Sequence, residues 1–441
     1  MKIAIVGTGY VGLTSGVCFS ELGNEVVCVD VNAEKINQLN CGIMPIYEPG
    51  IKELVIKNKE NKRLRFTTNL KEAVNRSEII IIAVGTPSLL DGNVDLSYIF
   101  AVANEIGSYI NNYKVIVNKS TVPVGTADDV KRIIFNNLVD KKIDFDVASV
   151  PEFLKEGSAI KDFFQTERVI IGTESNKARD LLVKLHKPLN SSIQTTDIRS
   201  AELIKYAANS FLAMKISFIN EIANLAELVG ADIKEVARGI GSDSRIGNKF
   251  LNAGIGFGGA CFPKDTKGLV KIAEQVGLEF SLLQEVIHIN ERQYNVILDK
   301  LKLVIPDLKG KKLAILGLSF KPNTDDMRDA PSISIIRELM IMEPSLTIRA
   351  YDPIAIESAK TAIKDNVQYF YTIEGALQDA DACIILTEWE QITSFSLDRY
   401  KQLLTSPIII DGRNCFDSED MDKAGINYLS IGRQNKVYSP L

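Results

Sequence analysis

KIAIVGTGYVG, residues 2–12, joins a short apolar run to a turn that contains Gly7, Gly9 and Gly12. The next apolar run ends at Asp30. In a strand–turn–helix unit, the first glycine permits a tight turn, the second lets a pyrophosphate approach the backbone, and the third lets the helix pack on the strand. The helix N-terminus attracts the phosphates, and the acid accepts from a ribose hydroxyl. The pattern predicts a dinucleotide-binding Rossmann unit; the alternative is a glycine turn without a nucleotide.

Further apolar runs predict three more buried parallel strands, each followed by a polar loop: residues 77–87, 113–123 and 145–157. In doubly wound sheets, ligands bind at the carboxyl ends of the strands. Thr86 and Thr121 follow the first two runs, so we expect them beside a cofactor. Glu152 and Glu156 lie in the loop after the third run.

Residues 200–229 contain no Gly or Pro and are apolar on most faces, which predicts one long buried helix. A helix of that length spans about 45 Å, more than one small domain needs. We therefore expect a spine between domains and a dimer contact. Lys205 and Asn209 are four residues apart and share one helical face. A buried lysine without a partner is costly, so it favours a functional role; the alternative is a side chain that reaches water.

The sequence near the C-terminus repeats the pattern of the N-terminus. KLAILG at 312–317 corresponds to KIAIVG, and Asp352 takes the place of Asp30. This half has no G-x-G-x-x-G, so we expect it to bind a different nucleotide. The chain is thus predicted to be an α/β protein in which a long central helix joins two Rossmann-like doubly wound domains. The expected bounds are 1–199 for the N-terminal domain, 200–305 for a helical dimerisation domain and 306–441 for the C-terminal domain.

The composition excludes several classes of protein. The 441 residues are 46% hydrophobic and carry a net charge of −5, so the basic surplus that nucleic-acid binding favours is absent. No uninterrupted apolar stretch reaches the roughly 20 residues of a membrane span. Glycines interrupt the first apolar run after Val6, which argues against a secretory leader. We expect a cytoplasmic protein without nucleic-acid or membrane partners.

The six cysteines include no CxxC pair, so the spacing of a metal site is absent and no metal is expected. Cys18, Cys28 and Cys383 sit in apolar runs and are expected in the core. Cys261 lies instead in GFGGACFPKD, residues 256–265, between glycines and a Lys–Asp pair. A disulfide is improbable in the cytoplasm. A small hydrophobic residue and a nucleophile remain the two interpretations of Cys261.

Eight motifs, taken together and in order, resemble those of the nucleotide-sugar 6-dehydrogenases of the UDP-glucose/GDP-mannose dehydrogenase family. They are GTGYVG, PIYEPG, VGTPSLLDG, KSTVPVGT, PEFLKEG, KYAANSFLAMKISFINE, GFGGACFPKD and GLSFKPNTDDMRDAPS. The resemblance covers essentially the whole chain. It implies a four-electron oxidation of a sugar C6 alcohol to a uronate, with NAD as the cofactor that takes a hydride twice.

In this family a cysteine traps the intermediate aldehyde as a thiohemiacetal, and the resulting thioester is hydrolysed. A thiol suits both steps because it attacks a carbonyl and later leaves. The resemblance assigns this role to Cys261, with a cation such as Lys264 or Lys205 favouring the thiolate. The neighbouring glycines would let the backbone approach the sugar closely.

The resemblance also assigns the other catalytic residues. Lys205 and Asn209 would stabilise developing oxyanions. Asp265 would orient Lys205 or hold water. Glu152 and Thr121 would position and activate the attacking water, with Glu152 as the base.

Binding residues follow in the same way. The implied cofactor contacts are Gly7, Gly9, Tyr10, Val11, Gly12, Asp30, Lys35, Thr86, Thr121, Glu156, Lys264 and Arg328. The implied substrate contacts are Glu152, Phe153, Leu154, Lys155, Lys205, Asn209, Arg245, Phe250, Leu251, Asn252, Ala253, Gly254, Gly258 and Lys321. Arg245 matches an arginine that in some members reaches the neighbouring subunit's substrate, which implies a homodimer. Val150 departs from the pattern, since many members carry Asn before PEFL.

Local sequence favours UDP-glucose as the substrate. UDP-N-acetylmannosamine dehydrogenases usually place His where this chain has Ala260, and Arg where it has Phe153. GDP-mannose dehydrogenases typically carry a His in the helix, which here reads NSFLAMK. UDP-galactose or an N-acetylated sugar remains an alternative substrate. The alternative functions are a catalytically silent nucleotide-sugar-binding protein and an ordinary two-electron dehydrogenase, which would not need a thiol at that position.

Overall fold

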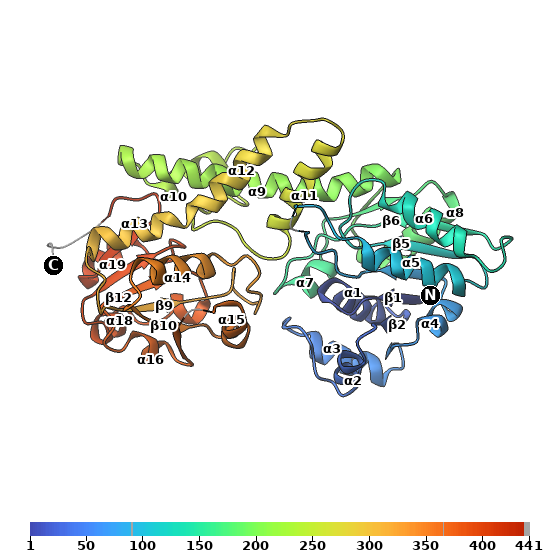
Figure 1. Cartoon of the computed structure of the whole chain (residues 1–441), viewed down its shortest axis with the longest axis horizontal. Helices are drawn as coiled ribbons and strands as arrows, with labels where there is room; N and C mark the ends of the chain where they lie inside the picture. The colour runs from blue at the N-terminus through green and yellow to red at the C-terminus, as the bar shows by residue number, and fades with distance from the viewer. Residues whose placement is uncertain (90, 365, 436–441) are drawn as a thin grey trace. The chain divides into compact units, whose positions relative to one another are not determined.

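The computed structural model describes residues 1–89, 91–364 and 366–435. It divides into two compact units, each built on its own sheet (Figure 1). The first unit comprises Met1–Ala208 with Lys271–Leu278, and the second Asn209–Val270 with Glu279–Leu441. The predicted fold class is confirmed: both units contain a Rossmann-like sheet, and one long helix continues from the first unit into the second.

The first unit contains a sheet of eight strands in the order β3-β2-β1-β4-β5-β6-β7-β8. Its first six strands are parallel and follow the doubly wound order 3-2-1-4-5-6. Only β7 pairs antiparallel with its neighbour β6. The strands are β1 (Lys2–Val6), β2 (Glu25–Val29), β3 (Leu64–Thr67), β4 (Ile79–Ile82), β5 (Lys114–Asn118), β6 (Phe145–Ser149), β7 (Arg168–Gly172) and β8 (Ser192–Thr196).

Helices cover both faces of this sheet, so its central strands β1, β4 and β5 are largely apolar on both sides. Ile3 and Ile5 of β1 pack in one core cluster, whereas Ala4 and Val6 pack in another, as the two-residue period of a strand requires. The helices are α1 (Tyr10–Glu21), α2 (Ala33–Asn40), α3 (Ile51–Glu60), α4 (Leu70–Arg76), α5 (Ser97–Tyr109), α6 (Thr126–Asn137), α7 (Ala159–Phe164) and α8 (Asn176–His186), followed by a 3₁₀ turn at Lys187–Leu189.

The predicted long helix is α9 (Ile198–Val229), which begins two residues earlier than expected and is green in Figure 1. It is not buried all round, because Phe211, Phe218, Leu225 and Leu228 are more than half exposed. The expectation of complete burial is therefore wrong for the single chain. Among the described residues, no helix combines the length and apolar character of a membrane span. The helices that follow are α10 (Ile233–Gly241), α11 (Phe262–Gln275), α12 (Ser281–Gln293) and α13 (Asn295–Val304).

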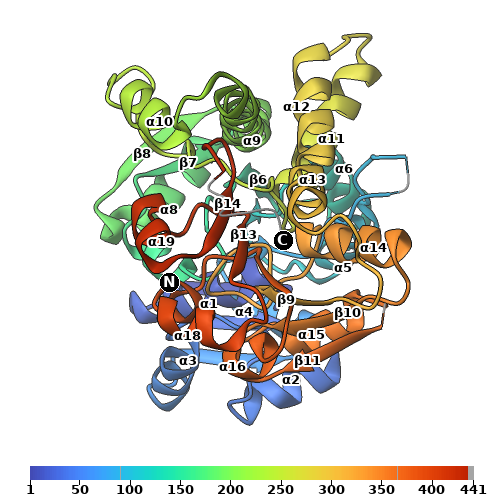
Figure 2. The same ribbon diagram turned by 90° about the vertical axis from the view of Figure 1, so that its left-hand side faces the viewer.

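The second unit contains a six-stranded parallel sheet in the order β11-β10-β9-β12-β13-β14, orange to red in Figure 2. Here β9 occupies the place that β1 has in the first sheet, which confirms the internal repeat. The strands are β9 (Lys312–Leu316), β10 (Thr347–Tyr351), β11 (Val367–Phe370), β12 (Ala382–Ile385), β13 (Ile408–Asp411) and β14 (Asn427–Ser430). The helices are α14 (Pro331–Met342), α15 (Ile356–Ala362), α16 (Ile373–Leu377), α17 (Glu390–Thr393), α18 (Leu397–Leu403) and α19 (Ser418–Ala424).

Candidate active site

The glycine turn between β1 and α1 has the geometry of a phosphate cradle. Gly7 has φ +103°, and a Cβ there would lie 2.5 Å from the Ala83 carbonyl oxygen. A Cβ on Gly12 would lie 2.0 Å from the Gly7 carbonyl oxygen, so only glycine allows this helix to pack so closely. A Cβ on Gly9 would meet no atom within 4 Å, and no side chain caps α1. The helix N-terminus thus presents its N–H groups beside open space, which fits a pyrophosphate.

Asp30 follows β2 and is fixed by the turn after β1. Its Oδ2 accepts from the Thr8 backbone N–H at 2.9 Å and from the Thr8 hydroxyl at 2.7 Å. Its Oδ1 accepts from the Asn32 N–H, and Lys35 Nζ lies 3.6 Å from Oδ2. Burial alone would raise the pKa of Asp30, but these hydrogen bonds lower it, so Asp30 is ionised at the sheet edge.

The loops after β4 and β5 meet at the same edge, as predicted. Thr86 Oγ1 donates to the Thr121 carbonyl oxygen at 3.1 Å. The Thr121 loop is also held from α9, because the Glu202 carboxylate accepts the N–H groups of Gly125 and Ala127 at 2.7 and 2.9 Å. Burial raises the pKa of Glu202 to about 7 despite these two hydrogen bonds.

Lys205 and Glu152 form a buried ion pair in the first unit. Lys205 Nζ lies 3.1 Å from Glu152 Oε1, and the two residues are 3% and 7% exposed. The Leu154 N–H donates to Glu152 Oε2 at 2.5 Å, and the Phe153 ring lies 5.3 Å from Lys205 Nζ. Lys205 therefore does not reach water with its head group, and the snorkelling alternative is wrong.

A tyrosine and a glutamate connect this loop to the glycine turn. Glu48 accepts from the N–H groups of Gly157 at 2.7 Å and Ile160 at 3.3 Å, and from the Tyr10 hydroxyl. Glu48 belongs to the quoted motif PIYEPG but was not among the predicted site residues. Its signal was an acid before Pro-Gly, a position that sequence alone does not connect to residues 157–160.

The second unit holds a cluster around Asp265, which is 1% exposed and lies in the first turn of α11. Asn209 Nδ2 donates to Asp265 Oδ2 at 2.6 Å, and Lys264 Nζ donates to Asp265 Oδ1 at 2.6 Å. The Asp265 N–H donates to the Cys261 carbonyl oxygen at 2.8 Å, which places Cys261 at the start of the helix. Asp265 thus orients Asn209 within this unit, while the predicted contact with Lys205 stays a prediction.

Cys261 differs from the core cysteines. Cys18, Cys28 and Cys383 are fully buried, as predicted. Burial raises the pKa of Cys18 and of Cys28 to about 12, and raises that of Cys383 well above its usual value. Cys261 is only partly buried. A thiol must be accessible to act as a nucleophile, and Cys261 meets this condition.

Contacts within the protein require two of the glycines around Cys261, and the close approach of the backbone to a sugar stays a prediction. A Cβ on Gly258 would lie 2.2 Å from the Asp329 carbonyl oxygen. Gly259 has φ +82°, and its Cβ would lie 2.6 Å from the Phe320 ring. Arg413, which sequence reasoning missed, binds the carbonyl oxygens of Gly256 and Phe320. Its only sequence signal was a charged residue directly after an apolar strand.

The remaining predicted binding residues lie in the second unit, except Lys155 in the first. Phe250 has φ +65°, Leu251 and Ala253 are buried, and Asn252 is exposed. The Gly254 N–H donates to Asn220 Oδ1 at 2.8 Å. Four predicted basic residues have near neighbours of their own: Lys155 with Asp162, Arg245 with Asp243, Arg328 with Asp326, and Lys321 with the Phe320 ring.

The predicted residues are divided between the two units. The group in the first unit is Gly7, Gly9, Tyr10, Val11, Gly12, Asp30, Lys35, Thr86, Thr121, Glu152, Phe153, Leu154, Lys155, Glu156 and Lys205. The group in the second unit is Asn209, Arg245, Phe250, Leu251, Asn252, Ala253, Gly254, Gly258, Cys261, Lys264, Asp265, Lys321 and Arg328.

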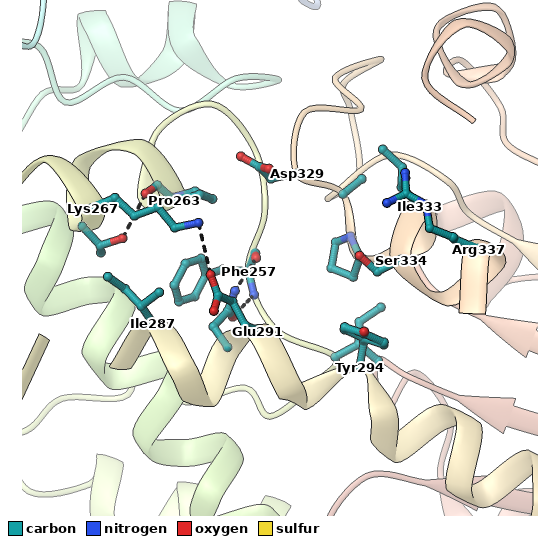
Figure 3. A pocket seen from close by; sticks show the side chains of 15 residues that line it. Phe257, Pro263, Lys267, Ile287, Glu291, Tyr294, Asp329, Ile333, Ser334 and Arg337 are labelled. Carbon is teal, nitrogen blue, oxygen red and sulfur yellow. Dashed lines mark hydrogen bonds and ion pairs between the residues drawn. The ribbon is translucent and has the colours of Figure 1, made fainter. Parts of the chain in front are cut away.

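The second unit also has a pocket of about 340 Å³, and none of these predicted residues lines it (Figure 3). Phe257 and Tyr294 line it, and Lys267 Nζ lies 3.1 Å from Glu291 Oε1 at its side. Its size therefore does not identify it as the reaction centre.

Comparison with known proteins finds matches along most of the chain. Residues 1–190 match the NAD binding domain of the UDP-glucose/GDP-mannose dehydrogenase family, 199–292 its central domain, and 314–418 its UDP binding domain. The chain is 52% identical to UDP-glucose 6-dehydrogenase TuaD of Bacillus subtilis, over 98% of this chain and 93% of that one. It is 46% identical to UDP-glucose 6-dehydrogenase of Rhizobium meliloti, over 98% and 100%.

A solved structure of a similar protein has the same fold. A UDP-glucose dehydrogenase from the archaeon Pyrobaculum islandicum superposes with a TM-score of 0.89 at 36% identity, covering 97% of this chain and 96% of that one. The matches include all three family domains in order. The chain belongs to the UDP-glucose/GDP-mannose dehydrogenase family.

Proposed function

We propose that this protein is an NAD-dependent dehydrogenase that oxidises UDP-glucose to UDP-glucuronate. The observation that carries the proposal is the near-complete match to proteins named UDP-glucose 6-dehydrogenase. The reaction consumes one sugar nucleotide, two NAD⁺ and one water, and it yields the uronate, two NADH and three protons. The phosphate cradle at Gly9 and the ionised Asp30 support the choice of cofactor.

Cys261 is proposed as the nucleophile. NAD, when bound, accepts the hydrides. The Cys261 sulfur adds to the C6 aldehyde to form a C–S bond, and Lys205 and Asn209 stabilise the oxyanion. After oxidation to the thioester, Glu152 takes a proton from a water positioned with Thr121, the water oxygen bonds to C6, and the thiolate leaves. The burial of Lys205 and Glu152 supports these roles, because charges act more strongly where water is excluded.

Asp265 and the remaining predicted residues are proposed to bind and orient the reactants. Asp265 fixes the Asn209 carboxamide through the 2.6 Å hydrogen bond. We assign NAD to the 1–199 domain and the UDP moiety to the 306–441 domain, with 200–305 as the helical domain between them in sequence. The match to a UDP binding domain at 314–418 supports this division.

A homodimer is the proposed working unit. Phe211, Phe218 and Leu225 follow one another at seven-residue spacing on α9, and they are 58%, 53% and 53% exposed. An apolar stripe of this kind fits a second copy of the helix. The Arg245 side chain is 87% exposed, which leaves it available to a partner's substrate. We also place the enzyme in the cytoplasm, since its cysteines lack the spacing of a disulfide framework.

The test is to mix the protein with NAD and each of several sugar nucleotides and to follow NADH. The panel contains UDP-glucose, UDP-galactose, UDP-N-acetylglucosamine, UDP-N-acetylmannosamine and GDP-mannose. We expect the highest kcat/KM for UDP-glucose, with two NADH formed per sugar. A higher kcat/KM for another sugar nucleotide would make that compound the assigned substrate. A yield of one NADH per sugar would indicate a two-electron dehydrogenase.

A further inference from the structure

Two buried lysines lie at the two ends of β5, and only one has an evident structural role. Lys114 and Lys119 are 0% and 7% exposed, and burial lowers the pKa of each to about 8. The Lys114 ammonium donates to the Ser77 carbonyl oxygen at 2.7 Å and to Asn112 Oδ1 at 2.9 Å. Within residues 1–89, 91–364 and 366–435, the Lys119 ammonium makes no hydrogen bond. The burial of Lys119 therefore needs another explanation.

Lys119 lines a small pocket behind Glu152. The pocket holds about 40 Å³, enough for a few water molecules, and Glu152, Arg168 and His186 also line it. The Arg168 guanidinium lies over the Phe153 ring at 4.3 Å. Burial, and then the charge of Lys119, lower the pKa of His186 to about 4, so this imidazole is neutral at pH 7.

One carboxylate and one other ammonium group act on Lys119. Glu152 attracts it and Lys205 repels it, and Glu152 is the carboxylate that Lys205 pairs with at 3.1 Å. Two buried ammonium groups therefore act on one buried carboxylate: Lys205 forms the ion pair, and Lys119 acts from beyond ion-pairing distance. A buried surplus of positive charge is costly, and such costs persist where they serve function.

The proposed mechanism explains why a second buried ammonium group is useful beside Glu152. When Lys205 turns its charge toward a substrate oxyanion, Glu152 would become a buried carboxylate without its cation, which strongly favours protonation. A protonated Glu152 cannot accept a proton from the attacking water. We propose that Lys119 is a positioning residue whose ammonium faces Glu152 across the pocket and keeps it ionised while Lys205 serves the substrate. This inference rests on the proposed roles of Glu152 and Lys205.

The test compares Lys119→Met, directly after β5, with Lys114→Met, a buried lysine at the start of β5. In Lys119→Met we expect thioester hydrolysis to slow about tenfold and its acid limb to move up by about one pH unit, because a nearby charge is lost. The Cys261-linked thioester should then accumulate, visible by intact-protein mass spectrometry in rapid-quench samples. Lys119→Met should also melt at a higher temperature, because a buried charge is removed.

Lys114→Met should do the opposite. It leaves the Ser77 carbonyl and Asn112 without a donor, so its melting temperature should fall while the pH profile keeps its acid limb. Lys119→Arg keeps the charge, so the acid limb of its pH profile should stay where it is in the unaltered enzyme. This variant replaces Lys119→Met in the comparison if the Met variant does not fold.

Glu152→Gln distinguishes a failure of the Lys119 role from a failure of the proposed mechanism. If Glu152→Gln accumulates the thioester and Lys119→Met shows neither accumulation nor a moved acid limb, the role of Lys119 is overturned while the proposed function stands. If Glu152→Gln hydrolyses the thioester as fast as the unaltered enzyme, Glu152 is not the base and the proposed mechanism fails first.

Discussion

The Asn209 carboxamide lies 2.6 Å from one oxygen of Asp265, and the Lys264 ammonium lies 2.6 Å from the other. Both oxygens of a carboxylate that is 1% exposed are therefore used by neighbouring side chains. This arrangement fixes which way the Asn209 amide turns, because only its nitrogen can donate to Asp265.

Asp265→Asn should disturb this arrangement with little change in shape. The new amide loses the charge that holds Lys264 and offers one acceptor where two were used, so the Asn209 orientation is no longer fixed. We expect kcat to fall more than KM changes, and a loss of about 1–3 kcal/mol in the free energy of unfolding. Steady-state kinetics and urea unfolding measure the two. An unchanged kcat would remove Asp265 from the proposed machinery.

Cys261→Ser should abolish formation of the acid while the fold survives. Serine without a neighbouring base is a poor nucleophile, and an alkoxide is a poor leaving group. Cys41→Ser is the matched control, because Cys41 is exposed and lies outside the predicted site. Product analysis by mass spectrometry and the NADH yield per sugar provide the readout. Two NADH per sugar at the unaltered rate in Cys261→Ser would end the covalent mechanism.

NAD should be preferred to NADP. The Asp30 carboxylate is fixed by Thr8 at the end of β2, where it accepts from a ribose 2′-hydroxyl and repels a 2′-phosphate. Lys35 lies 3.6 Å from the same carboxylate, so we expect preference rather than exclusion. The value of kcat/KM should be higher with NAD than with NADP, and this difference between the cofactors should be smaller in Asp30→Asn. Equal values in the unaltered protein would refute this.

Much of the fold was predictable because its signals are local. The apolar run before Gly7 and its repeat before Gly317 each give a central strand, and Asp30 and Asp352 follow the neighbouring strands in both sheets. Asp352 Oδ2 accepts the Leu318 N–H much as Asp30 accepts that of Thr8. Short-range patterns of glycine, apolar residues and one acid determine these features.

The contacts within the site were less predictable because they join distant parts of the chain. Lys205 finds its carboxylate 53 residues away, and Glu48 binds the Gly157 N–H 109 residues away. Nothing in the sequence near Lys119 distinguishes it from Lys114, which lies at the other end of the same apolar run. The exposed stripe on α9 was missed for a related reason: an apolar helix shows its periodicity but not which of its faces the same chain covers.

The stability of the α6–α9 contact should depend on pH through Glu202. Burial raises its pKa to about 7, above its unfolded value of about 4.5, so the folded state binds this proton more tightly. The contribution is fully present below pH 4.5 and is lost as pH rises to about 7, a loss of up to about 3 kcal/mol. Glu202→Gln cannot titrate. In urea unfolding, the free energy of unfolding of the unaltered protein should therefore rise relative to that of Glu202→Gln as pH falls from 8 to 5. A difference between the two free energies that does not change with pH would contradict this prediction.

The exposed stripe on α9 should hold two copies of the chain together. Phe218→Glu places a charge in the middle of this stripe, where a partner helix would have to desolvate it, so the variant should sediment as a monomer. Val139→Glu is the control, because Val139 is 82% exposed in the first unit and lies outside the stripe. A dimeric Phe218→Glu would place the interface elsewhere.

The last prediction concerns Arg245, which should act on the partner's substrate. Each site would then contain Cys261 from one chain and Arg245 from the other, so Arg245→Ala and Cys261→Ser should each be inactive alone. Co-expression of the two variants forms hybrid dimers in which one site has both residues intact. We expect partial recovery, up to half of the unaltered activity per hybrid dimer. Differently tagged chains, purified in two steps, isolate that dimer, and its inactivity would show that Arg245 acts within its own chain.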